Sequence, residues 1–274
     1  MSVSRIKTIV IAALVLVNAF FLTLILINNY ADARDERQMI ETACSILQSN
    51  GIAINPDSII TSGAFSAMRT ARSIEAEEAI AYAFLGQVEM ADQGGDIYLY
   101  ENADRGIAEF SGAGDFDIRL HAGVVGYADG ASKTAQEFLR DMKLETSAPT
   151  SSLDSDGERI LVYSEYMGAR IFNCTIEFMF VGDSLQTVRG RYVSNVEPVE
   201  SGAQISQVGT ALLGFLAALK RDEIECREIL SVEPGYRHGA AGAFGEGVLN
   251  PSWLITTDDG RYLLDSATGE IRNA

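Results

Sequence analysis

The sequence predicts an α+β protein: a single N-terminal transmembrane helix followed by tandem modules, each of one helix and an antiparallel sheet. Three observations predict this fold class. A mostly apolar run occupies residues 9–27, stretches of helical period alternate with stretches of period two, and Gly and Asp residues separate the period-two stretches. This order favours modules in which one helix packs across a sheet.

The apolar run at residues 9–27 is interrupted only by Asn18 and Thr23. A helix of this length spans about 30 Å, which matches the hydrocarbon core of a bilayer. The alternative is a cleaved signal peptide, because residues 31–33 resemble a small-residue cleavage site. Signal peptides have a shorter apolar region, of about 7–15 residues, so the sequence favours an uncleaved anchor.

The charges that flank the apolar run predict its orientation. Arg5 and Lys7 precede it and acidic residues soon follow, so the positive-inside rule keeps the N-terminus in the cytoplasm. We therefore expect a single-pass protein of the cell membrane with an extracytoplasmic C-terminal part. The predicted parts are a cytoplasmic N-terminus, the anchor, a first extracytoplasmic α+β module and a second extracytoplasmic α+β region, over residues 1–8, 9–28, 29–131 and 132–274.

Asn18 lies near the middle of the predicted membrane helix, and two interpretations of it stay open. Its amide either finds a backbone partner in its own helix or bonds to another transmembrane helix. The predicted partner-binding residues are the polar and aromatic side chains of this segment, namely Asn18, Phe20, Phe21 and Thr23.

The net charge of −17 excludes some partners. Nucleic acid requires clustered Lys and Arg, and anionic lipid headgroups attract basic segments, so neither suits this chain. Residues 1–31 hold two basic residues and no acid, which leaves the remainder with 19 basic and 38 acidic residues. Three cysteines are too few for a disulfide framework, and small buried hydrophobes are the favoured interpretation over a redox role.

The first exterior unit begins with helical spacing over residues 34–48, a stretch that can continue the membrane helix as a stalk. A second helix is predicted at residues 74–85, ending at Gly86. Strands then follow, predicted at residues 97–100, 106–110 and 116–120.

The second unit begins near residue 132, where we interpret Ser132 as the N-cap of an amphipathic helix. Residues 146–157 are rich in Ser, Thr, Pro and Asp and are predicted to form a loop. Three strands follow, predicted at residues 160–165, 172–180 and 185–193, and the middle one alternates between apolar and polar positions with Met179 as the exception.

The third unit has an apolar helical stripe from Val208 to Leu219 and a strand at residues 224–232. Residues 235–247 are rich in Gly and Ala and are predicted to form a loop. A closing hairpin is predicted over residues 253–264, with a type I′ turn at the Asp-Gly pair, because both central residues of that turn need positive φ.

No catalytic constellation stands out in the sequence. His121 and His238 lie in no metal-binding motif, and no nucleophile elbow, dinucleotide fingerprint or CxxC pair occurs. Asp115 and Asp117 form a weak carboxylate pair that is most simply assigned to a turn and a solvated strand. We therefore expect no catalytic residue, no metal and no cofactor, and we favour a binding or regulatory role over catalysis.

Several short motifs, taken in order, resemble the YycH/YycI family of bacterial regulators. They are Ser4-Arg5-Ile6-Lys7-Thr8-Ile9, the 47–54 stretch with Asn50-Gly51-Ile52, Asp96-Ile97-Tyr98-Leu99-Tyr100, Ala135-Gln136-Glu137-Phe138-Leu139, Tyr166-Met167-Gly168-Ala169-Arg170-Ile171-Phe172 and Leu249-Asn250-Pro251-Ser252-Trp253. The ending, residues 259–270, is similar to the closing hairpin of PepSY-like modules.

The resemblance implies an accessory regulator of an essential sensor histidine kinase of the WalK (YycG) type. Its expected partners are that kinase, touched by the anchor helix, and a YycH-like membrane protein, touched outside the membrane. The family has no catalytic residues to carry over. Two alternatives stay open: a PepSY-like module that binds peptides or inhibits a protease, and, less favoured, an enzyme of the cell envelope.

Overall fold

The computed structural model describes residues 34–61, 65–127, 130–153, 155, 157–200, 202–222, 224–240 and 246–274. This part is a mixed α+β protein with a large sheet, as the sequence predicts. Within the described ranges, no helix has both the length and the apolar character needed to cross a membrane. The predicted N-terminus (1–8) and anchor (9–28) lie outside the described residues.

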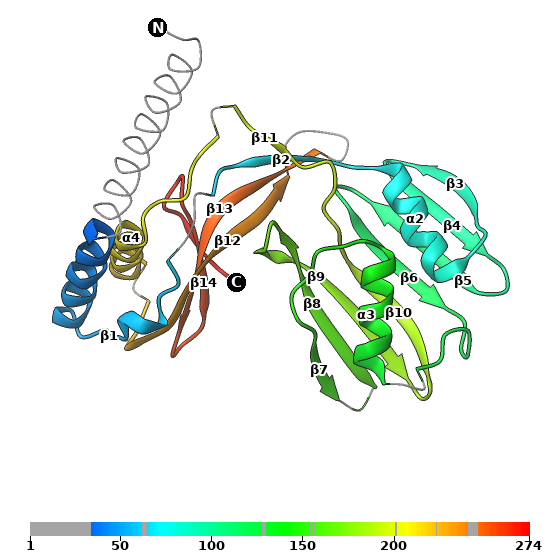
Figure 1. Ribbon diagram of the computed structural model, residues 1–274, viewed down its shortest axis with the longest axis horizontal. Coiled ribbons are helices and arrows are strands. Elements are labelled where there is room, and N and C mark those ends of the chain that lie inside the picture. The colour runs from blue at the N-terminus through cyan, green and yellow to red at the C-terminus, as the bar shows by residue number, and fades with distance from the viewer. Residues whose placement is uncertain are drawn as a thin grey trace, which may run out of the picture.

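The chain forms two lobes that share one strand (Figure 1). Lobe A contains helix 34–49, the 3-10 helix η1 (Pro56–Ser58), α4 (Val208–Arg221) and strands β1 (Ala53–Ile54), β2 (Met68–Ala71), β11 (Glu197–Pro198), β12 (Glu228–Ala240), β13 (Glu246–Thr257), β14 (Arg261–Asp265) and β15 (Ile271–Asn273). Lobe B contains α2 (Ile74–Leu85), α3 (Ala131–Asp141) and strands β3 (Glu89–Gly94), β4 (Ile97–Asn102), β5 (Gly106–Ser111), β6 (Asp115–Leu120), β7 (Thr150–Leu153), β8 (Glu158–Tyr166), β9 (Ala169–Val181) and β10 (Ser184–Arg191). Strand β9 also pairs with β12 of lobe A.

Lobe B is built from two modules with the same order of elements, a helix followed by four antiparallel strands. The first module is α2–β3–β4–β5–β6 and the second is α3–β7–β8–β9–β10. Strands β6 and β10 pair antiparallel, so the strand order is β3-β4-β5-β6-β10-β9-β8-β7. The sheet therefore continues across the boundary predicted at residues 131 and 132.

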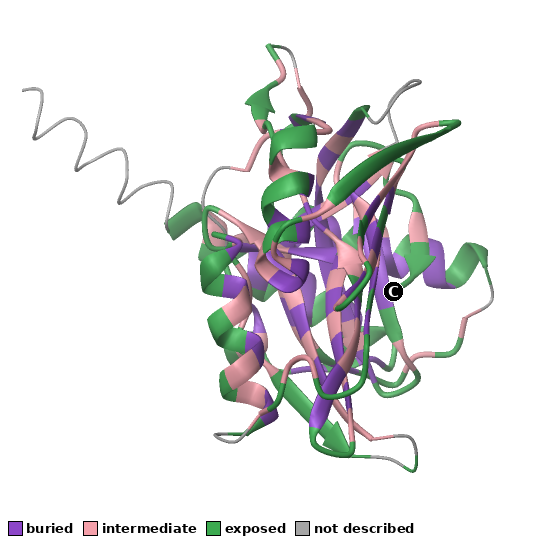
Figure 2. Cartoon of the chain, turned by 90° about the vertical axis from the view of Figure 1, so that its right-hand side faces the viewer, coloured by how far each residue is buried: buried purple, intermediate pink, exposed green. Residues whose placement is uncertain are grey.

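The core of lobe B lies between this sheet and the two helices (Figure 2). Helix α2 begins at the N-cap Ser73, whose side chain accepts a hydrogen bond from the Ala76 backbone, and ends at Gly86. Its bounds are those predicted from the sequence. Phe84 is fully buried and stacks on Phe138 of α3, with ring centroids 4.3 Å apart. This contact joins the two modules on the helical side of the sheet.

The N-cap predicted for α3 is wrong. The helix begins at Ala131, its N-cap is Gly130, and no side chain caps it. Ala131 is buried, so the first turn packs into the core and Ser132 lies inside the helix instead of before it.

Lobe A packs helix 34–49 and α4 on one face of its sheet. Ile40, Ala43 and Leu47 of the first helix are buried in the same cluster as the predicted stripe of α4. The opposite side of this cluster comes from β12, β13 and β14, with Trp253 fully buried. The helix at residues 34–49 is therefore part of the lobe core, not a free stalk.

Two predicted loops contain strands. Residues 150–153 form β7, the short outer strand of the sheet, and the 235–247 stretch belongs largely to β12 and β13. Here the glycines make room for neighbours: a Cβ on Gly235 would overlap the Phe172 ring, and one on Gly247 would overlap the His238 ring. From the sequence pattern alone, such glycines are interpreted as turn residues.

The closing hairpin is confirmed, but its turn type is wrong. Trp253 pairs with Leu264 and Ile255 with Tyr262, as expected for one buried face. Asp259 and Gly260 do not have positive φ, so the turn is not type I′. The side chain of Thr257 closes it instead by accepting hydrogen bonds from the backbone N–H groups of residues 259 and 260, at 3.3 and 3.0 Å.

Candidate functional site

The predicted partner-binding residues Asn18, Phe20, Phe21 and Thr23 lie outside the described residues. In the described ranges, no group of three or more His, Cys, Asp or Glu side chains is placed to hold a metal ion. The candidate site within the structure is instead a polar hollow on lobe B, which we call the charged groove.

The charged groove lies on the face of the sheet that points away from α2 and α3. It has a volume of about 410 Å³ and is lined by Glu109, Ser111, Asp115, Phe116, Asp117, Asn173, Thr175, Arg189, Gly190 and Arg191. Strand alternation explains the position: residues 116, 118 and 120 of β6 face the helices, so Asp115 and Asp117 face the groove. Because β6 pairs with β10, Arg191 lies opposite Asp115 and Arg189 opposite Asp117.

Ion pairs across these two strands fill the floor of the groove. Arg191 forms a two-pronged contact with Asp115, at 2.8 Å from Nε and 2.7 Å from Nη2. Arg189 Nε lies 3.1 Å from Asp117, which also accepts from Arg119 at 3.2 Å. Arg191 donates to Asp115, and this hydrogen bond raises the pKa of Arg191. Burial of the guanidinium acts in the opposite direction. The groove thus holds alternating carboxylates and guanidinium groups that are already paired with each other.

Beside the groove, Asn173 joins lobe B to lobe A. Its amide accepts from the His238 backbone N–H at 2.8 Å and donates to the His238 carbonyl at 2.7 Å. The His238 side chain is 3% exposed, and its Nε2 lies 3.0 Å from the Thr70 hydroxyl of β2. Burial, together with the charge of Arg191, lowers the pKa of His238 to about 4. A neutral imidazole therefore links β12 to β2, and the His238 backbone links β12 to β9.

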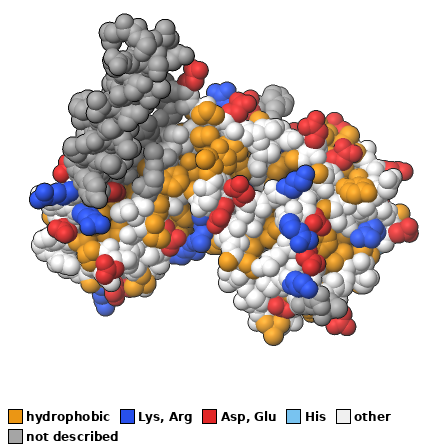
Figure 3. Space-filling view, in the orientation of Figure 1, with side chains coloured by type: hydrophobic (Ala, Val, Ile, Leu, Met, Phe, Trp, Pro, Cys, Tyr) orange, Lys and Arg blue, Asp and Glu red, His pale blue; other side chains and the backbone are white. Residues whose placement is uncertain are grey.

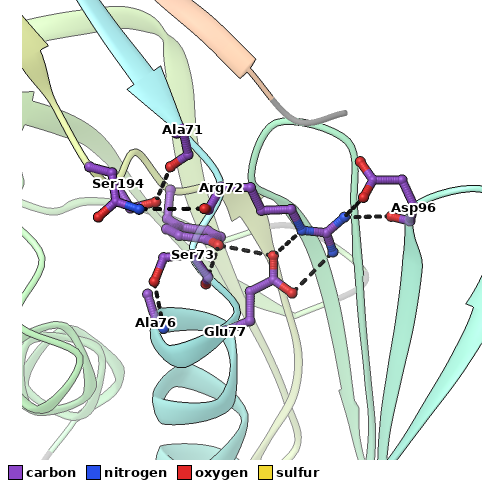
Figure 4. A network of polar contacts seen from close by, with 9 residues as sticks. Ala71, Arg72, Ser73, Ala76, Glu77, Asp96 and Ser194 are labelled. Atoms are coloured by element: carbon purple, nitrogen blue, oxygen red, sulfur yellow. Dashed lines mark hydrogen bonds and ion pairs between the residues drawn. The ribbon is translucent and has the colours of Figure 1, made fainter. Parts of the chain in front are cut away.

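A second polar cluster lies where the chain passes between the lobes (Figure 4). Arg72 follows β2, and its guanidinium bonds to Glu77 of α2 and to Asp96 in the β3–β4 turn. The contact from Arg72 Nη1 to Asp96 Oδ1 is 2.7 Å, and that from Nη2 to Glu77 Oε2 is 3.0 Å. Tyr192, just after β10, places its hydroxyl 3.0 Å from Glu77 and 3.2 Å from the Ser73 carbonyl. We call these five residues the crossing cluster.

The Arg72–Glu77 pair of the crossing cluster is almost completely shielded from solvent, whereas the Asp96 side chain is 29% exposed. The side chains of Arg72 and Glu77 are 6% and 0% exposed. Burial opposes the charge of Arg72, yet the hydrogen bond and charge of Glu77 raise its pKa. Burial, reinforced by the charge of Glu77, raises the pKa of Tyr192. The chain passes into lobe B at Arg72 and out of it at Tyr192. Because both residues bond to Glu77, the Arg72–Glu77 pair holds the two passages together.

In both clusters the arginines are thus paired with carboxylates. Asp115 and Asp117 were visible in the sequence as a carboxylate pair, and the structure adds the arginines opposite them. Arg189 and Arg191 have period-two spacing in the predicted 185–193 strand, which places both on one face of that strand. This spacing is the sequence feature that could have identified them as site residues. Their pairing with β6 was not predictable, because it joins strands about 70 residues apart.

The cysteines take no part in either cluster. Cys44 and Cys174 are buried and Cys226 is half-buried, and all three are free thiols. Burial raises the pKa of Cys174 to about 12 and that of Cys226 to about 11. The first two are small buried hydrophobes, as the sequence predicts.

Comparisons with known proteins give fold-level likenesses alone. No family model matches the chain, and no curated protein matches it. An uncharacterized protein from Eubacterium rectale ATCC 33656 is 12% identical with a TM-score of 0.49, and the match covers 81% of this chain and 90% of that one. YycH from Bacillus subtilis is 10% identical with a TM-score of 0.38, and the match covers 76% of this chain and 52% of YycH. Both TM-scores lie below 0.5, so membership of the YycH/YycI family stays a prediction.

Proposed function

We propose that the chain is a membrane-anchored, extracytoplasmic accessory regulator of a sensor histidine kinase of the WalK/YycG type, acting beside a YycH-like partner in cell-wall homeostasis. The role is regulatory, not enzymatic. The sequence supports this through the apolar run at residues 9–27, the flanking charges and the ordered family motifs.

One structural observation carries the proposal. The helical residues 34–49 follow the apolar run closely in the sequence, and they pack in the core of lobe A. Leu47 is fully buried, and a Cβ on Gly209 of α4 would lie 3.2 Å from the Met39 backbone, so the two helices approach closely. A small apolar cluster of Phe172, Leu254 and Leu263 then connects lobe A to lobe B. In this proposal, a change in the packing of the anchor is transmitted through helix 34–49 to the exterior lobes.

Such coupling suits regulation by population shift. A kinase with two helix-bundle states responds to an accessory helix only by the difference in its affinity for the two states. A coupling of about 1–3 kcal/mol changes the output by roughly 5-fold to 150-fold. The anchor residues Asn18, Phe20, Phe21 and Thr23 are the proposed contacts, and the lobes hold the second partner.

The peptide-binding alternative, which the closing hairpin suggested, is less favoured. One face of the hairpin, with Trp253 and Tyr262, is buried against the helices of lobe A. The other face, with Leu254 and Leu263, is buried against Phe172 of β9. Both faces of the hairpin are therefore buried in the core, which leaves little exposed surface for a peptide.

The test separates the anchor from its connection to the lobes. In one variant an unrelated single-pass anchor replaces residues 1–31, and in a second a flexible Gly-Ser segment is inserted directly before residue 34. Both should lose the effect on kinase-dependent transcription, the first because the kinase contact is gone and the second because the lobes are uncoupled from it.

The same Gly-Ser segment inserted after Gly269, in the exposed turn before β15, is the matched control and should leave regulation intact. Co-purification with the kinase should survive the insertion before residue 34 but not the anchor replacement. Unchanged transcription with the foreign anchor would remove the membrane-contact mechanism.

A further inference from the structure

Strand β3 has a free edge. It is the last strand on its side of the lobe B sheet, and all six of its residues are exposed (Figure 2). A free edge presents unpaired backbone N–H and C=O groups, which can pair with a strand from another polypeptide. Proteins usually protect such edges with charged side chains, especially Lys, or with Pro, a bulge or short length, and β3 has Glu89, Asp92 and a bulge at its far end. Residues 89–94 contain neither Lys nor Pro.

The opposite edge of the same sheet, β7, is also exposed but is shorter and differs in its flanking residue. It is only four residues long, Pro149 precedes it, and the Ser151 hydroxyl donates to Glu158 at 2.9 Å. Strand β3 is longer and keeps regular register with β4 from Glu89 to Asp92, before a bulge at its far end. The two edges of one sheet are therefore protected unequally.

Like charges meet at the β3 edge. Glu89 lies directly opposite Glu101 of β4, and both side chains are exposed. Among the described residues neither has an ion-pair partner, and the next residue in this row is Ile107 of β5. Directly opposed like charges destabilise a sheet. A cation placed beside Glu89 would relieve that repulsion.

The other face of β3 carries one large apolar side chain, Met90, beside Asp92. Met90 is opposite Tyr100, on the side of the sheet that carries α2, and it is 54% exposed. Tyr82, on α2, is 58% exposed. A strand added at this edge would bury Met90 on one face while it neutralised Glu89 on the other, because side chains alternate along a strand.

We propose that β3 binds an extended segment of a partner polypeptide in which Lys or Arg alternates with apolar residues. The basic side chain lies beside Glu89 and the apolar one beside Met90. A second copy of this chain fits less well, because pairing two β3 strands would bring Glu89 and Asp92 of both copies to one edge. Acidic side chains also gather on the rim of lobe B where β3 lies (Figure 3). The proposal does not depend on the kinase or on the anchor.

Peptide binding to the full-length chain tests the proposal. The probe is a labelled eight-residue peptide of alternating Lys and Val, N-methylated at every second residue so that only one edge can pair. Fluorescence anisotropy should show at least about tenfold tighter binding than for the same peptide with Glu in place of Lys. On binding, hydrogen exchange should slow at residues 89–92 and not at β7.

Charge reversal provides the matched variants. Glu89→Lys should weaken the Lys peptide about tenfold and strengthen the Glu peptide, because the pair across the new strand changes from attraction to repulsion. Glu137→Lys, an equal change of charge at an exposed position of α3, should alter neither. Equal weakening by both variants, protection of β7 in place of β3, or a homodimer that Glu89→Lys disrupts would each overturn the proposal.

Discussion

The two modules of lobe B share one topology, but of their two helices only α2 buries a charged side chain among the described residues. In the first module, α2 carries the buried Glu77, which holds Arg72 and Tyr192 at the point where the chain passes between the lobes. In the second module, α3 does not follow a passage between the lobes, and it buries only apolar residues, Ala131, Ala135 and Leu139. A buried ion pair thus occurs at α2, where the chain passes between the lobes twice. The described residues of α3, which lies at no such passage, bury no charged side chain.

Counting from the N-cap makes the comparison residue by residue. Glu77 is four residues after Ser73, and the equivalent of Glu77 in α3 is Thr134, four residues after Gly130. Thr134 is half-buried, and its hydroxyl donates to the Gly130 carbonyl at 3.2 Å. Changes at matched positions should therefore separate the passage contact from ordinary helix packing.

The largest difference is expected for Glu77→Ala against Thr134→Ala. Removing Glu77 leaves the guanidinium of Arg72 buried without its main partner, which typically costs about 3–5 kcal/mol. Thr134→Ala should change the free energy of unfolding by no more than about 0.5 kcal/mol. Urea unfolding of both variants measures the contrast. Equal losses would mean that the crossing cluster adds nothing beyond helix packing.

Sequence patterns predicted the local elements of these modules well. The bounds of α2 and the alternating burial of β9 follow from local period, because each element buries one face. The pattern missed β3, since residues 89–94 contain no β-branched or aromatic side chain and the strand is held by β4 alone. It also missed β7 for a related reason: an edge strand needs little apolar surface.

Contacts between residues far apart in the sequence could not be predicted from local sequence patterns. Arg72 and Tyr192 are 120 residues apart, and only their placement around Glu77 gives them a shared role. Helix 34–49 and α4 lie together although residues 50–207 separate them in the sequence. Asp115 was assigned to a solvated turn, and its pairing with Arg191 depends on the β6–β10 contact between modules.

The buried hydroxyl of Tyr100 should make the first module sensitive to alkali. Burial, with added repulsion from Glu77, raises its pKa from 10.0 to about 12. A raised pKa means that the stabilisation is complete below pH 10 and is lost as the pH rises towards 12, because the unfolded chain ionises first. Tyr100→Phe should therefore gain stability relative to the wild type across that range.

At neutral pH Tyr100→Phe should be close to neutral, since the hydroxyl has no hydrogen-bond partner among the described residues. The matched variant in the second module is Tyr127→Phe, which removes a hydroxyl that donates to Gly182 at 2.7 Å. It should lose about 1 kcal/mol already at pH 7. Urea midpoints from pH 8 to 12 measure both, and a constant offset between wild type and Tyr100→Phe would contradict the assigned cause.

The smallest difference concerns how the two helices begin. Ser73 accepts a hydrogen bond from the Ala76 backbone at 3.2 Å, so Ser73→Ala should cost about 1 kcal/mol. Ser132 lies inside α3, and no side chain caps that helix, so Ser132→Ala should be neutral or slightly stabilising, because Ala favours a helix interior. Thermal unfolding of the two variants is the measurement. If Ser132→Ala destabilised as much as Ser73→Ala, the cap of α3 would lie at Ser132 after all, and the two modules would begin their helices by the same contact.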